Sequence, residues 1–341
     1  MTDGVLRVGV IGCGYWGPKL ARNFDELPGV ELVAVADLSP ERRAHMAAKY
    51  PRAEVLAEHR ALLGLGLDAV AIATPVATHV PLAIEALDAG CHVLVEKPLA
   101  ASSAGARAVV AAGAAAGRML MVGHTFAYHP AVAYIREQVA TGQLGTIYYV
   151  DAVRANLGIH QPDVHVAWDL APHDLTILEM LIGRPPSRVR AHGVGHVRPG
   201  VPDVAWLTLD YPGGITASLH LSWLAPSKVR QLTVVGDRRM LVFDDAATLD
   251  KVRIFDRGVE APPHTDSYGE FQLSYRYGDV VTPRLDGTEP LRLECEHFVA
   301  VARGEVAPLT DGCAGLRVVQ VLEAVDRSLA ADGGWARVEV V

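Results

Sequence analysis

The chain of 341 residues is too long for one ordinary core, so two domains are expected, and half of its residues are hydrophobic, which suffices for both. A formal net charge of −8 without any run of Lys and Arg excludes nucleic acid and anionic membranes as expected partners, and the apolar stretches, which are only strand-length, exclude a bilayer span. A strand pattern begins at Leu6, which leaves no room for a signal peptide, and the cysteines at 13, 91, 295 and 313 lack metal or disulfide spacing, so a cytoplasmic location is expected.

The first part of the chain carries a glycine-rich motif between two predicted strands. An apolar run at 6–11 leads into Gly12-Cys13-Gly14-Tyr15-Trp16-Gly17, a helical pattern follows, and a second strand at 30–36 ends at Asp37. The first glycine makes a tight turn, the second lets backbone approach a pyrophosphate, and the third lets the helix pack on the strand. The helix N-terminus favours phosphate, and the acid binds a ribose hydroxyl. The sequence therefore predicts a dinucleotide site formed by Gly12, Gly14, Tyr15, Trp16, Gly17 and Asp37.

Asp37 also bears on which dinucleotide is bound. A carboxylate at this position accepts hydrogen bonds from the 2′-hydroxyl of NAD and repels the 2′-phosphate of NADP. Arg42 and Arg43 lie nearby in sequence and offer an alternative that receives the phosphate. NAD is the predicted cofactor, with NADP as the alternative.

Strands and helices continue to alternate up to about residue 125. Helices are predicted at 39–49, 77–89 and 103–117, and strands at 68–73, 91–95 and 119–122. Near-continuous apolar strands between helices indicate a doubly wound parallel sheet, so residues 1–125 are predicted to form a Rossmann domain. Ligands of such sheets bind outside the carboxyl ends of the strands, which places four loops on one rim: Gly12–Gly17, Asp37, Thr74–Pro75 and Glu96–Lys97–Pro98.

Lys97 stands out on this rim because only five of the 31 basic residues are lysines. An ammonium group can lose its proton when it is desolvated, whereas a guanidinium in practice cannot. A Lys at the carboxyl end of a buried strand is therefore a candidate for proton transfer or for orienting a substrate hydroxyl. The alternatives are an ordinary surface Lys and a simple pair with Glu96, which contributes little if exposed.

Residues 126–341 are predicted to form an α+β domain for substrate binding and oligomerisation. After a helix at 131–139, strands are predicted at 146–156, 188–197, 205–211, 215–223, 230–235, 240–243 and 252–255, and two helices at 291–303 and 313–331. Along 215–223 apolar residues alternate with small polar ones, which indicates a large, mainly antiparallel open sheet with one face packed on helices. The polar face is either solvated or stacked on a second subunit, and we expect a homodimer or homotetramer through it. Residues 259–290 show little regular pattern, as in a functional loop or a wrapping arm.

Candidates for chemistry in this half lie between 154 and 174. Asp169 and His173 are four residues apart in a predicted helix that begins at about Trp168, so they share a face. A carboxylate that holds an imidazole makes it a better base near neutral pH. Two other interpretations remain: Asp169 as a helix N-cap and His173 as a core histidine.

A metal site and a set of substrate contacts are the other hypotheses for this region. His160 and His165, taken with His173, match no standard zinc spacing and no cysteine joins them, so no metal is predicted. Arg154 and Asn156 alternate on one strand face and either meet a substrate or solvate a sheet edge. Substrate contacts are predicted at Arg154, Asn156, His165 and Trp168.

These motifs together resemble the Gfo/Idh/MocA oxidoreductase family over essentially the whole chain. The resemblance rests on the glycine motif Gly12–Gly17, Thr74–Pro75 with His79, Glu96–Lys97–Pro98, and Asp169 with His173. It implies a Rossmann domain joined to an antiparallel sheet domain, an NAD(P) cofactor, and hydride transfer at a secondary alcohol of a sugar or cyclitol.

The resemblance also implies roles for individual residues. Lys97 would be the catalytic lysine, His173 the acid/base, and Asp169 its partner, all acting on one substrate hydroxyl. Thr74, Pro75, His79, Glu96 and Lys97 join the predicted cofactor contacts. The peptide bond between Lys97 and Pro98 is expected to be cis.

The residues before His173 depart from many family members, which have a glycine just before the histidine. The run Val166–His173 instead resembles the subgroup that acts on nucleotide sugars, such as UDP-N-acetylglucosamine 3-dehydrogenases. The predicted reaction is therefore oxidation at C3 of a nucleotide sugar. An inositol or free-sugar dehydrogenase is the alternative enzyme, and a non-catalytic NAD(P)-binding regulator is the alternative of another class.

Overall fold

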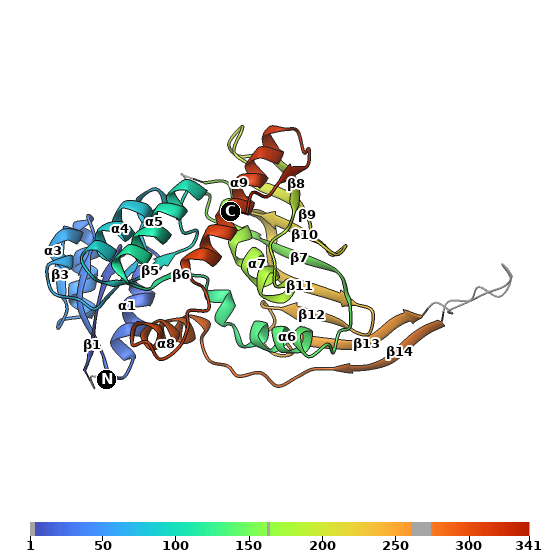
Figure 1. Cartoon of the computed structure of the whole chain (residues 1–341), viewed down its shortest axis with the longest axis horizontal. Coiled ribbons are helices and arrows are strands. Elements are labelled where there is room, and N and C mark those ends of the chain that lie inside the picture. Colours follow the sequence, from blue (N-terminus) through green and yellow to red (C-terminus); the bar gives the residue numbers. More distant parts are fainter. Residues whose placement is uncertain (1–3, 162–163, 261–273, 341) are drawn as a thin grey trace. The chain divides into compact units, whose positions relative to one another are not determined.

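The computed structural model describes residues 4–161, 164–260 and 274–340, which form two compact units (Figure 1). Unit 1 comprises Met1–His129 and Thr288–Gln320, and unit 2 comprises Pro130–Gly287 and Val321–Val341. In its second half the chain passes from unit 2 to unit 1 at residue 288 and back to unit 2 at residue 321. The two units are described separately below.

Unit 1 is built on a six-stranded sheet in the order β3-β2-β1-β4-β5-β6, and every neighbouring pair is parallel. This confirms the predicted doubly wound fold. The strands are β1 (Leu6–Ile11), β2 (Val30–Ala36), β3 (Glu54–Leu56), β4 (Ala69–Ile72), β5 (His92–Glu96) and β6 (Leu120–Gly123). The helices are α1 (Gly17–Glu26), α2 (Pro40–Lys49), α3 (His59–Leu63), α4 (His79–Asp88), α5 (Ser103–Ala116), α8 (Pro290–Ala302) and the first part of α9 (Gly312–Ala330), with 3-10 turns η1 (Val76–Thr78) and η2 (Thr125–Tyr128).

Local sequence accounts for most of these elements. All four residues of β4 are buried, as expected for a central strand covered on both faces. The Ser39 hydroxyl accepts a hydrogen bond from the Arg42 amide at 3.3 Å and so caps the N-terminus of α2. β3 and α3 were not predicted, because three and five residues are too few to show a period.

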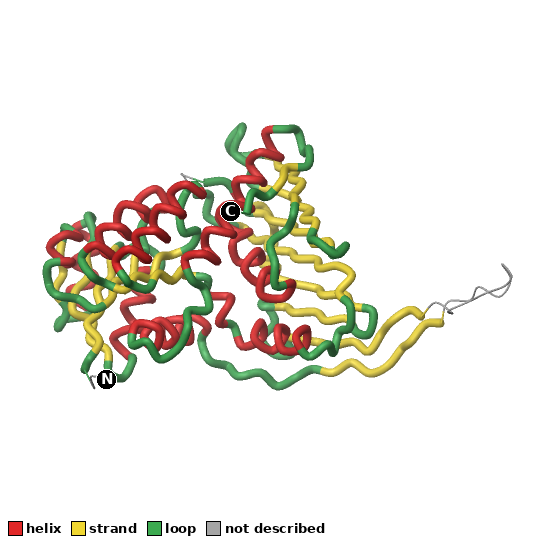
Figure 2. The backbone as a smooth tube through the Cα atoms, viewed as in Figure 1, coloured by secondary structure: helices red, strands yellow, loops and turns green. Residues whose placement is uncertain are grey.

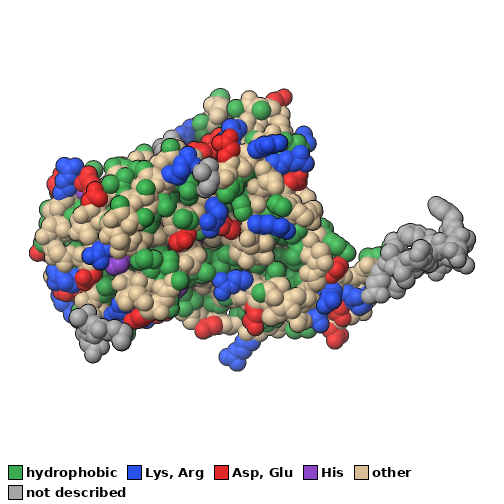
Figure 3. Space-filling view, viewed as in Figure 1, with side chains coloured by type: hydrophobic (Ala, Val, Ile, Leu, Met, Phe, Trp, Pro, Cys, Tyr) green, Lys and Arg blue, Asp and Glu red, His purple; other side chains and the backbone are tan. Residues whose placement is uncertain are grey.

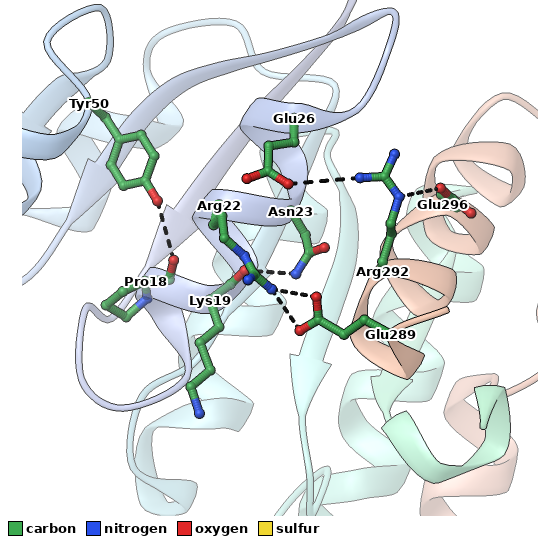
Figure 4. A network of polar contacts seen from close by, with 9 residues as sticks. All are labelled: Pro18, Lys19, Arg22, Asn23, Glu26, Tyr50, Glu289, Arg292 and Glu296. Atoms are coloured by element: carbon green, nitrogen blue, oxygen red, sulfur yellow. Dashed lines mark hydrogen bonds and ion pairs between the residues drawn. The ribbon is translucent and has the colours of Figure 1, made fainter. Parts of the chain in front are cut away.

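Polar contacts attach α8 to α1 within unit 1 (Figure 4). The guanidinium of Arg22 donates to both carboxylate oxygens of Glu289, and Arg292 reaches Glu26 on α1 and Glu296 on its own helix. The rings of Phe24 and Phe298 meet edge to face behind these ions, with centroids 6.1 Å apart. These contacts explain why a segment from the end of the chain belongs to the first unit.

Unit 2 is built on a nine-stranded sheet in the order β14-β13-β12-β11-β7-β10-β9-β8-β15 (Figure 2). Only the β7–β10 pair is parallel among the paired strands of the described residues, so the predicted mainly antiparallel sheet is confirmed. The strands are β7 (Ile147–Leu157), β8 (Arg188–Val194), β9 (Val204–Asp210), β10 (Thr216–Ser222), β11 (Leu224–Gly236), β12 (Met240–Asp244), β13 (Val252–Glu260), β14 (Ser274–Val281) and β15 (Ala336–Arg337). The helices are α6 (Pro130–Ala140), α7 (Val166–Ile182) and the remainder of α9.

The predicted alternation along β10 gives the sheet two unlike faces. Ala217, Leu219 and Leu221 are buried, and α7 packs against this strand, whereas Ser218 is exposed and His220 is half-buried. The prediction that 259–290 lacks regular structure was wrong for Ser274–Val281, which pairs with β13 as β14. Its hydrophobic residues, Tyr275, Tyr277, Val280 and Val281, are all exposed and do not alternate regularly along the strand, so the pattern was weak; residues 261–273 lie outside the described part of the chain.

The distribution of charge on the surface agrees with the absence of basic runs in the sequence. In the face drawn in Figure 3, acidic and basic side chains are interspersed rather than gathered by sign. Among the described residues, none of the helices is both long enough and apolar enough to cross a membrane.

Candidate active site

The glycine motif forms the turn between β1 and α1, and two of its glycines are sterically required. Gly12 has φ +90°, and a Cβ there would lie 2.6 Å from the carbonyl oxygen of Ala73. A Cβ on Gly17 would lie 1.8 Å from the carbonyl oxygen of Gly12. Gly14 is different, because a Cβ there would meet only the Arg42 guanidinium, at 3.7 Å. The first and third glycines thus shape the turn, and the second leaves backbone open to a ligand.

The N-terminus of α1 adds donors and aromatic side chains beside this turn. No side chain caps the helix; Pro18 has no N–H and the Lys19 amide donates to the Trp16 carbonyl at 2.9 Å, so the Gly17 amide is the donor that the first turn offers a phosphate. Trp16 is the N-cap residue, and its ring meets that of Tyr15 edge to face at 5.7 Å. The Lys19 ammonium lies 3.6 Å from the centroid of the Tyr15 ring, which is largely exposed.

Asp37 holds the turn from the end of β2. Its side chain is 7% exposed, and its two carboxylate oxygens accept hydrogen bonds from the amides of Cys13, at 2.6 Å, and Ser39, at 2.8 Å. The Arg42 guanidinium lies 3.6 Å from the same carboxylate. Burial and the Asp37 charge raise the pKa of the Cys13 thiol to about 12, so this cysteine stays a neutral packing group. A glycine cradle, a helix N-terminus without a side-chain cap and an acid at the end of β2 fit NAD.

His79 joins two of the predicted rim loops. Its ring is 1% exposed; Nδ1 lies 2.9 Å from the carbonyl oxygen of Pro98, and Nε2 lies 2.9 Å from that of Thr74. The Thr74 hydroxyl in turn accepts a bond from Thr78 at 2.8 Å. These contacts of His79 are with the loops themselves, so its direct contact with the cofactor stays a prediction.

Lys97 follows β5 directly and is half-buried. The Lys97–Pro98 bond is cis, as the resemblance implied. The preceding Glu96 is 8% exposed, and one of its carboxylate oxygens accepts a bond from the Lys97 amide at 3.2 Å. Burial raises the pKa of Glu96 to about 7, although the charges of Lys97 and Lys19 oppose that shift. The alternative of an exposed ion pair between Glu96 and Lys97 is therefore wrong, because the Glu96 carboxyl is buried inside unit 1.

In unit 2, Asp169 and His173 lie on α7, which begins earlier than predicted. The helix starts at Val166, and the His165 ring caps it by accepting a bond from the Ala167 amide at 3.3 Å. Asp169 lies in the first turn, so the N-cap interpretation of Asp169 was wrong. One helical turn separates Asp169 from the half-buried His173, which places the two on the same face.

Trp223 is a contact of Asp169 that the sequence analysis did not single out. Its indole Nε1 donates to a carboxylate oxygen of Asp169 at 3.0 Å, and its ring is 1% exposed. The His160 ring lies 5.1 Å from the Trp223 ring. A buried indole requires an acceptor for its N–H, so the sequence could have predicted that Trp223 has a polar partner. It could not have predicted that the partner is Asp169.

Three of the four predicted substrate residues have polar partners within the protein. His165 and the indole of Trp168 both bond to Asp326 on α9, at 2.8 Å and 3.0 Å. Arg154 is 5% exposed and donates to both carboxylate oxygens of Asp174, at 2.9 Å and 2.7 Å. These contacts favour structural roles for Arg154, His165 and Trp168. The substrate contacts predicted for the four residues stay predictions. Asn156 is half-buried on β7, and a Cβ on Gly158 would lie 3.4 Å from its amide nitrogen.

Metal binding finds no support in the described ranges. No group of three or more His, Cys, Asp or Glu side chains is arranged there to hold an ion. His160 and His165 instead contact Trp223 and Asp326.

Comparison with known proteins decides the family. Residues 6–124 match the family described as "Oxidoreductase family, NAD-binding Rossmann fold", and residues 132–242 match the "GFO/IDH/MocA C-terminal domain". UDP-N-acetylglucosamine 3-dehydrogenase of Acidithiobacillus ferrooxidans is 30% identical over 316 residues, which cover 92% of this chain and 94% of that enzyme. This chain belongs to the Gfo/Idh/MocA family. It is an oxidoreductase with an NAD-binding Rossmann domain, as the resemblance implied.

Other members of the Gfo/Idh/MocA family agree with this placement. A solved structure of the Acidithiobacillus ferrooxidans enzyme has a TM-score of 0.80 with 28% identity and covers 96% of this chain and 99% of its own. Inositol 2-dehydrogenase of Rubrobacter xylanophilus is 39% identical over 166 residues, 48% of this chain and 47% of that enzyme. The WlbA dehydrogenase of Bordetella pertussis, solved with NADH and UDP-GlcNAcA, has a TM-score of 0.79 at 21% identity and covers 98% of this chain and 99% of its own; it shares the fold.

Proposed function

We propose that this protein oxidises the C3 hydroxyl of a nucleotide sugar to a ketone with NAD. The observation that carries the proposal is the similarity to UDP-N-acetylglucosamine 3-dehydrogenase over 92% of the chain. The geometry supports it, because the chain has a dinucleotide cradle, a half-buried lysine after β5, and a carboxylate and an imidazole one helical turn apart on α7.

The proposal assigns a separate task to each side chain. His173 removes the proton of the substrate hydroxyl, and Asp169 orients the imidazole and stabilises the charge that it gains. Trp223 fixes Asp169 through its indole N–H. Lys97 orients the hydroxyl and stabilises the alkoxide that develops. NAD, held by the glycine turn and Asp37, would supply the acceptor for the hydride of the same carbon.

Two other functions give different results in one assay. An inositol or free-sugar dehydrogenase has support from the inositol 2-dehydrogenase of Rubrobacter xylanophilus, whose identity is higher but which aligns with less than half of the chain. A regulator that binds NAD without turnover needs none of Lys97, Asp169 and His173, so their joint presence favours an enzyme.

The deciding experiment follows nicotinamide absorbance with a panel of UDP-sugars, dTDP-ketosugars and inositols. We expect reduction of NAD with a UDP-sugar that has a free 3-hydroxyl, and no reduction when that hydroxyl is replaced by hydrogen. Turnover only with inositols would replace the nucleotide-sugar assignment by the cyclitol one. NAD binding without turnover on any member of the panel would favour the regulator.

We further propose that the protein is a homodimer or homotetramer through the open face of the unit 2 sheet. On this face His192, Trp206 and His220 lie in register on β8, β9 and β10, and the Trp206 ring stacks on both histidines. Trp206 is 45% exposed in the single chain, which is unusual for so large an aromatic ring. Light scattering of the wild type and of Trp206→Glu tests this assembly: a monomeric wild type would contradict it.

A further inference from the structure

The glycine turn of unit 1 has a cation on either side. The Arg42 guanidinium lies 3.6 Å from the Asp37 carboxylate, so its charge has a partner. Lys19, half-buried in the first turn of α1, is different: among the residues that the structure describes, no carboxylate forms an ion pair with its ammonium. In Figure 4 its side chain points away from the carboxylates of Glu26 and Glu289. The proposed reaction has no task for this lysine.

The first turn of α1 is an unfavourable place for a cation. A helix N-terminus carries about half a positive charge, so it repels an ammonium there. The first turn contains no acid that would offset this repulsion, and no side chain caps the helix. The Lys19 charge acts on the buried Glu96, but the two side chains form no ion pair within the described ranges. The position therefore suits a bound anion better than it suits an unliganded lysine.

Two aromatic rings hold the ammonium beside the glycine turn. Lys19 Nζ lies 3.6 Å from the centroid of the Tyr15 ring and 4.4 Å from that of the Trp16 ring. These rings belong to the two residues between the second and third glycines of the motif, where backbone approaches a diphosphate. An aromatic face attracts a cation without neutralising it. The ammonium is thus fixed next to the turn and keeps its charge.

The turn itself supplies little positive charge to the cofactor of this family. The diphosphate of NAD is a dianion, whereas the helix N-terminus contributes only about half a positive charge. Pro18 has no N–H, and the Lys19 amide donates to the Trp16 carbonyl at 2.9 Å, so the first turn offers the Gly17 amide. An ammonium held beside this donor adds the charge that the backbone lacks.

We propose that Lys19 is a cofactor-binding residue whose ammonium, held over the Tyr15 and Trp16 rings, pairs with the diphosphate of NAD. NAD binding belongs to the Rossmann domain of the family, so this role does not depend on the proposed reaction. Nucleotide sugars also contain a diphosphate, and separate measurements distinguish the cofactor from the substrate. A lysine that only supports the fold would leave the affinity for NAD unchanged.

Calorimetric titration with NAD tests this role without any substrate. At about 50 mM salt, Lys19→Met should bind NAD about 10-fold more weakly than the wild type, because it loses one charge-assisted contact. Lys19→Arg keeps the charge and should stay within about threefold. Lys49→Met is the matched control: it removes another lysine over a tyrosine ring, with Nζ 5.4 Å from the Tyr50 ring, and should not change the affinity. Wild-type affinity in Lys19→Met would overturn the proposal.

Ligand fragments and salt separate a contact with the diphosphate from a disturbed turn. ADP-ribose contains the diphosphate, so its affinity should fall in Lys19→Met as that of NAD does, whereas adenosine should bind both proteins equally. The 10-fold difference for NAD should shrink to about threefold or less at about 500 mM salt, because salt screens an accessible ion pair. Equal losses for adenosine and ADP-ribose, with a lower unfolding temperature, would show a structural role and contradict the proposal.

A double-mutant cycle tests whether the Tyr15 ring acts through Lys19. Tyr15→Leu removes the ring beneath the ammonium and should weaken NAD binding about threefold in the wild-type background. In the Lys19→Met background the same change should have no effect, because the charge that the ring holds is already absent. Additive losses in the double variant would contradict the holding role of the ring.

Steady-state kinetics identify which diphosphate the ammonium contacts, once a substrate is known. In Lys19→Met the KM for NAD should rise about 10-fold, and the KM for the nucleotide sugar should stay within about twofold. An unchanged Kd for NAD with a raised KM for the sugar would assign Lys19 to the substrate and overturn the cofactor assignment. If no sugar is turned over, the proposed function fails, while calorimetry with NAD and ADP-ribose still decides the role of Lys19.

Discussion

The predicted site residues of the two units are held in different ways. In unit 1 the geometry depends on the backbone: Gly12 needs a positive φ, Gly17 has no space for a Cβ, and the His79 ring lies between two backbone carbonyl oxygens, each 2.9 Å from a ring nitrogen. In unit 2 it depends on side chains that are far apart in sequence. His165 and Asp326, for example, are 161 positions apart, and Asp169 and Trp223 are 54 apart.

This difference governs how each half tolerates change. A backbone constraint depends on one residue type at one position, so a substitution there strains the backbone at that position and has a large effect on stability or binding. A side-chain pair depends on two residues. Removal of one partner costs the free energy of one hydrogen bond plus the desolvation penalty of the group that is left unpaired. Substitutions in unit 1 are therefore expected to have larger effects than substitutions in unit 2.

Lys97→Met is expected to have the largest effect. Turnover should fall at least about 100-fold, because the variant lacks the charge that stabilises the developing alkoxide. NAD affinity should stay within about threefold, since Lys97 is only one of the predicted cofactor contacts and the glycine cradle and Asp37 are unchanged. Stopped-flow turnover and fluorescence titration with NAD measure the two quantities. Lys49→Met is the control, and turnover by Lys97→Met at the wild-type rate would remove Lys97 from the mechanism.

Substitution of two glycines separates folding from binding within the same turn. In Gly17→Ala the new Cβ would lie 1.8 Å from a backbone oxygen, so both thermal stability and NAD affinity should fall, with a stability loss of at least about 2 kcal/mol. In Gly14→Ala the new Cβ meets only the Arg42 guanidinium, at the ordinary contact distance of 3.7 Å, so stability should be unchanged and NAD should bind about 10-fold more weakly. Equal stability losses in the two variants would contradict the division of roles.

These two glycines also show why unit 1 was the easier half to predict. Its constraints are local, so residue type and spacing are sufficient to locate the turn, the acid and the lysine. The unit 2 helix α7 was predicted, but its start was not, because His165 is an unusual cap. The return of residues 288–320 to unit 1 and the pairing of Ser274–Val281 depend on tertiary contacts that leave no local pattern.

The same reasoning applies to the contacts of the predicted substrate residues. Arg154 and Asn156 alternate on a strand as expected, but alternation does not reveal that Arg154 faces Asp174 on α7. His165 and Trp168 share one acceptor, Asp326 on the last helix. This shared contact depends on the tertiary fold and leaves no pattern in the sequence. Sequence therefore predicts which residues can carry chemistry, and packing decides which of them have structural partners.

The buried acid of unit 1 predicts how stability depends on pH. Glu96 has a pKa of about 7 in the folded state against an ordinary value of 4.5, so folding favours its protonated form. That contribution is complete below about pH 4.5 and is lost as the pH rises through about 7. The unfolding free energy of the wild type minus that of Glu96→Gln should therefore decrease by about 3 kcal/mol over this range.

Denaturant titrations at matched pH measure this difference. Glu85→Gln is the control with the opposite sign, because hydrogen bonds from Arg60 and His59 lower the pKa of Glu85 to about 2. Its contribution is present above about pH 4.5 and is lost only as the pH falls toward 2. A wild-type minus Glu96→Gln difference that does not change between about pH 5 and about pH 8 would contradict a raised pKa of the buried Glu96 carboxyl.

Trp223→Phe is expected to have the smallest effect, and it tests the side-chain half of the comparison. The variant keeps most of the buried ring and loses the 3.0 Å bond to Asp169, so stability should fall by about 1–2 kcal/mol. If Asp169 orients His173, turnover should also fall about 10-fold, and its acid limb should move because the carboxylate is less constrained. Trp335→Phe, at an exposed indole beside Arg188, controls for the substitution itself. A stability loss with an unchanged pH profile would make Trp223 a core residue only, and would leave Asp169 without the constraint that distinguishes it from any other acid on α7.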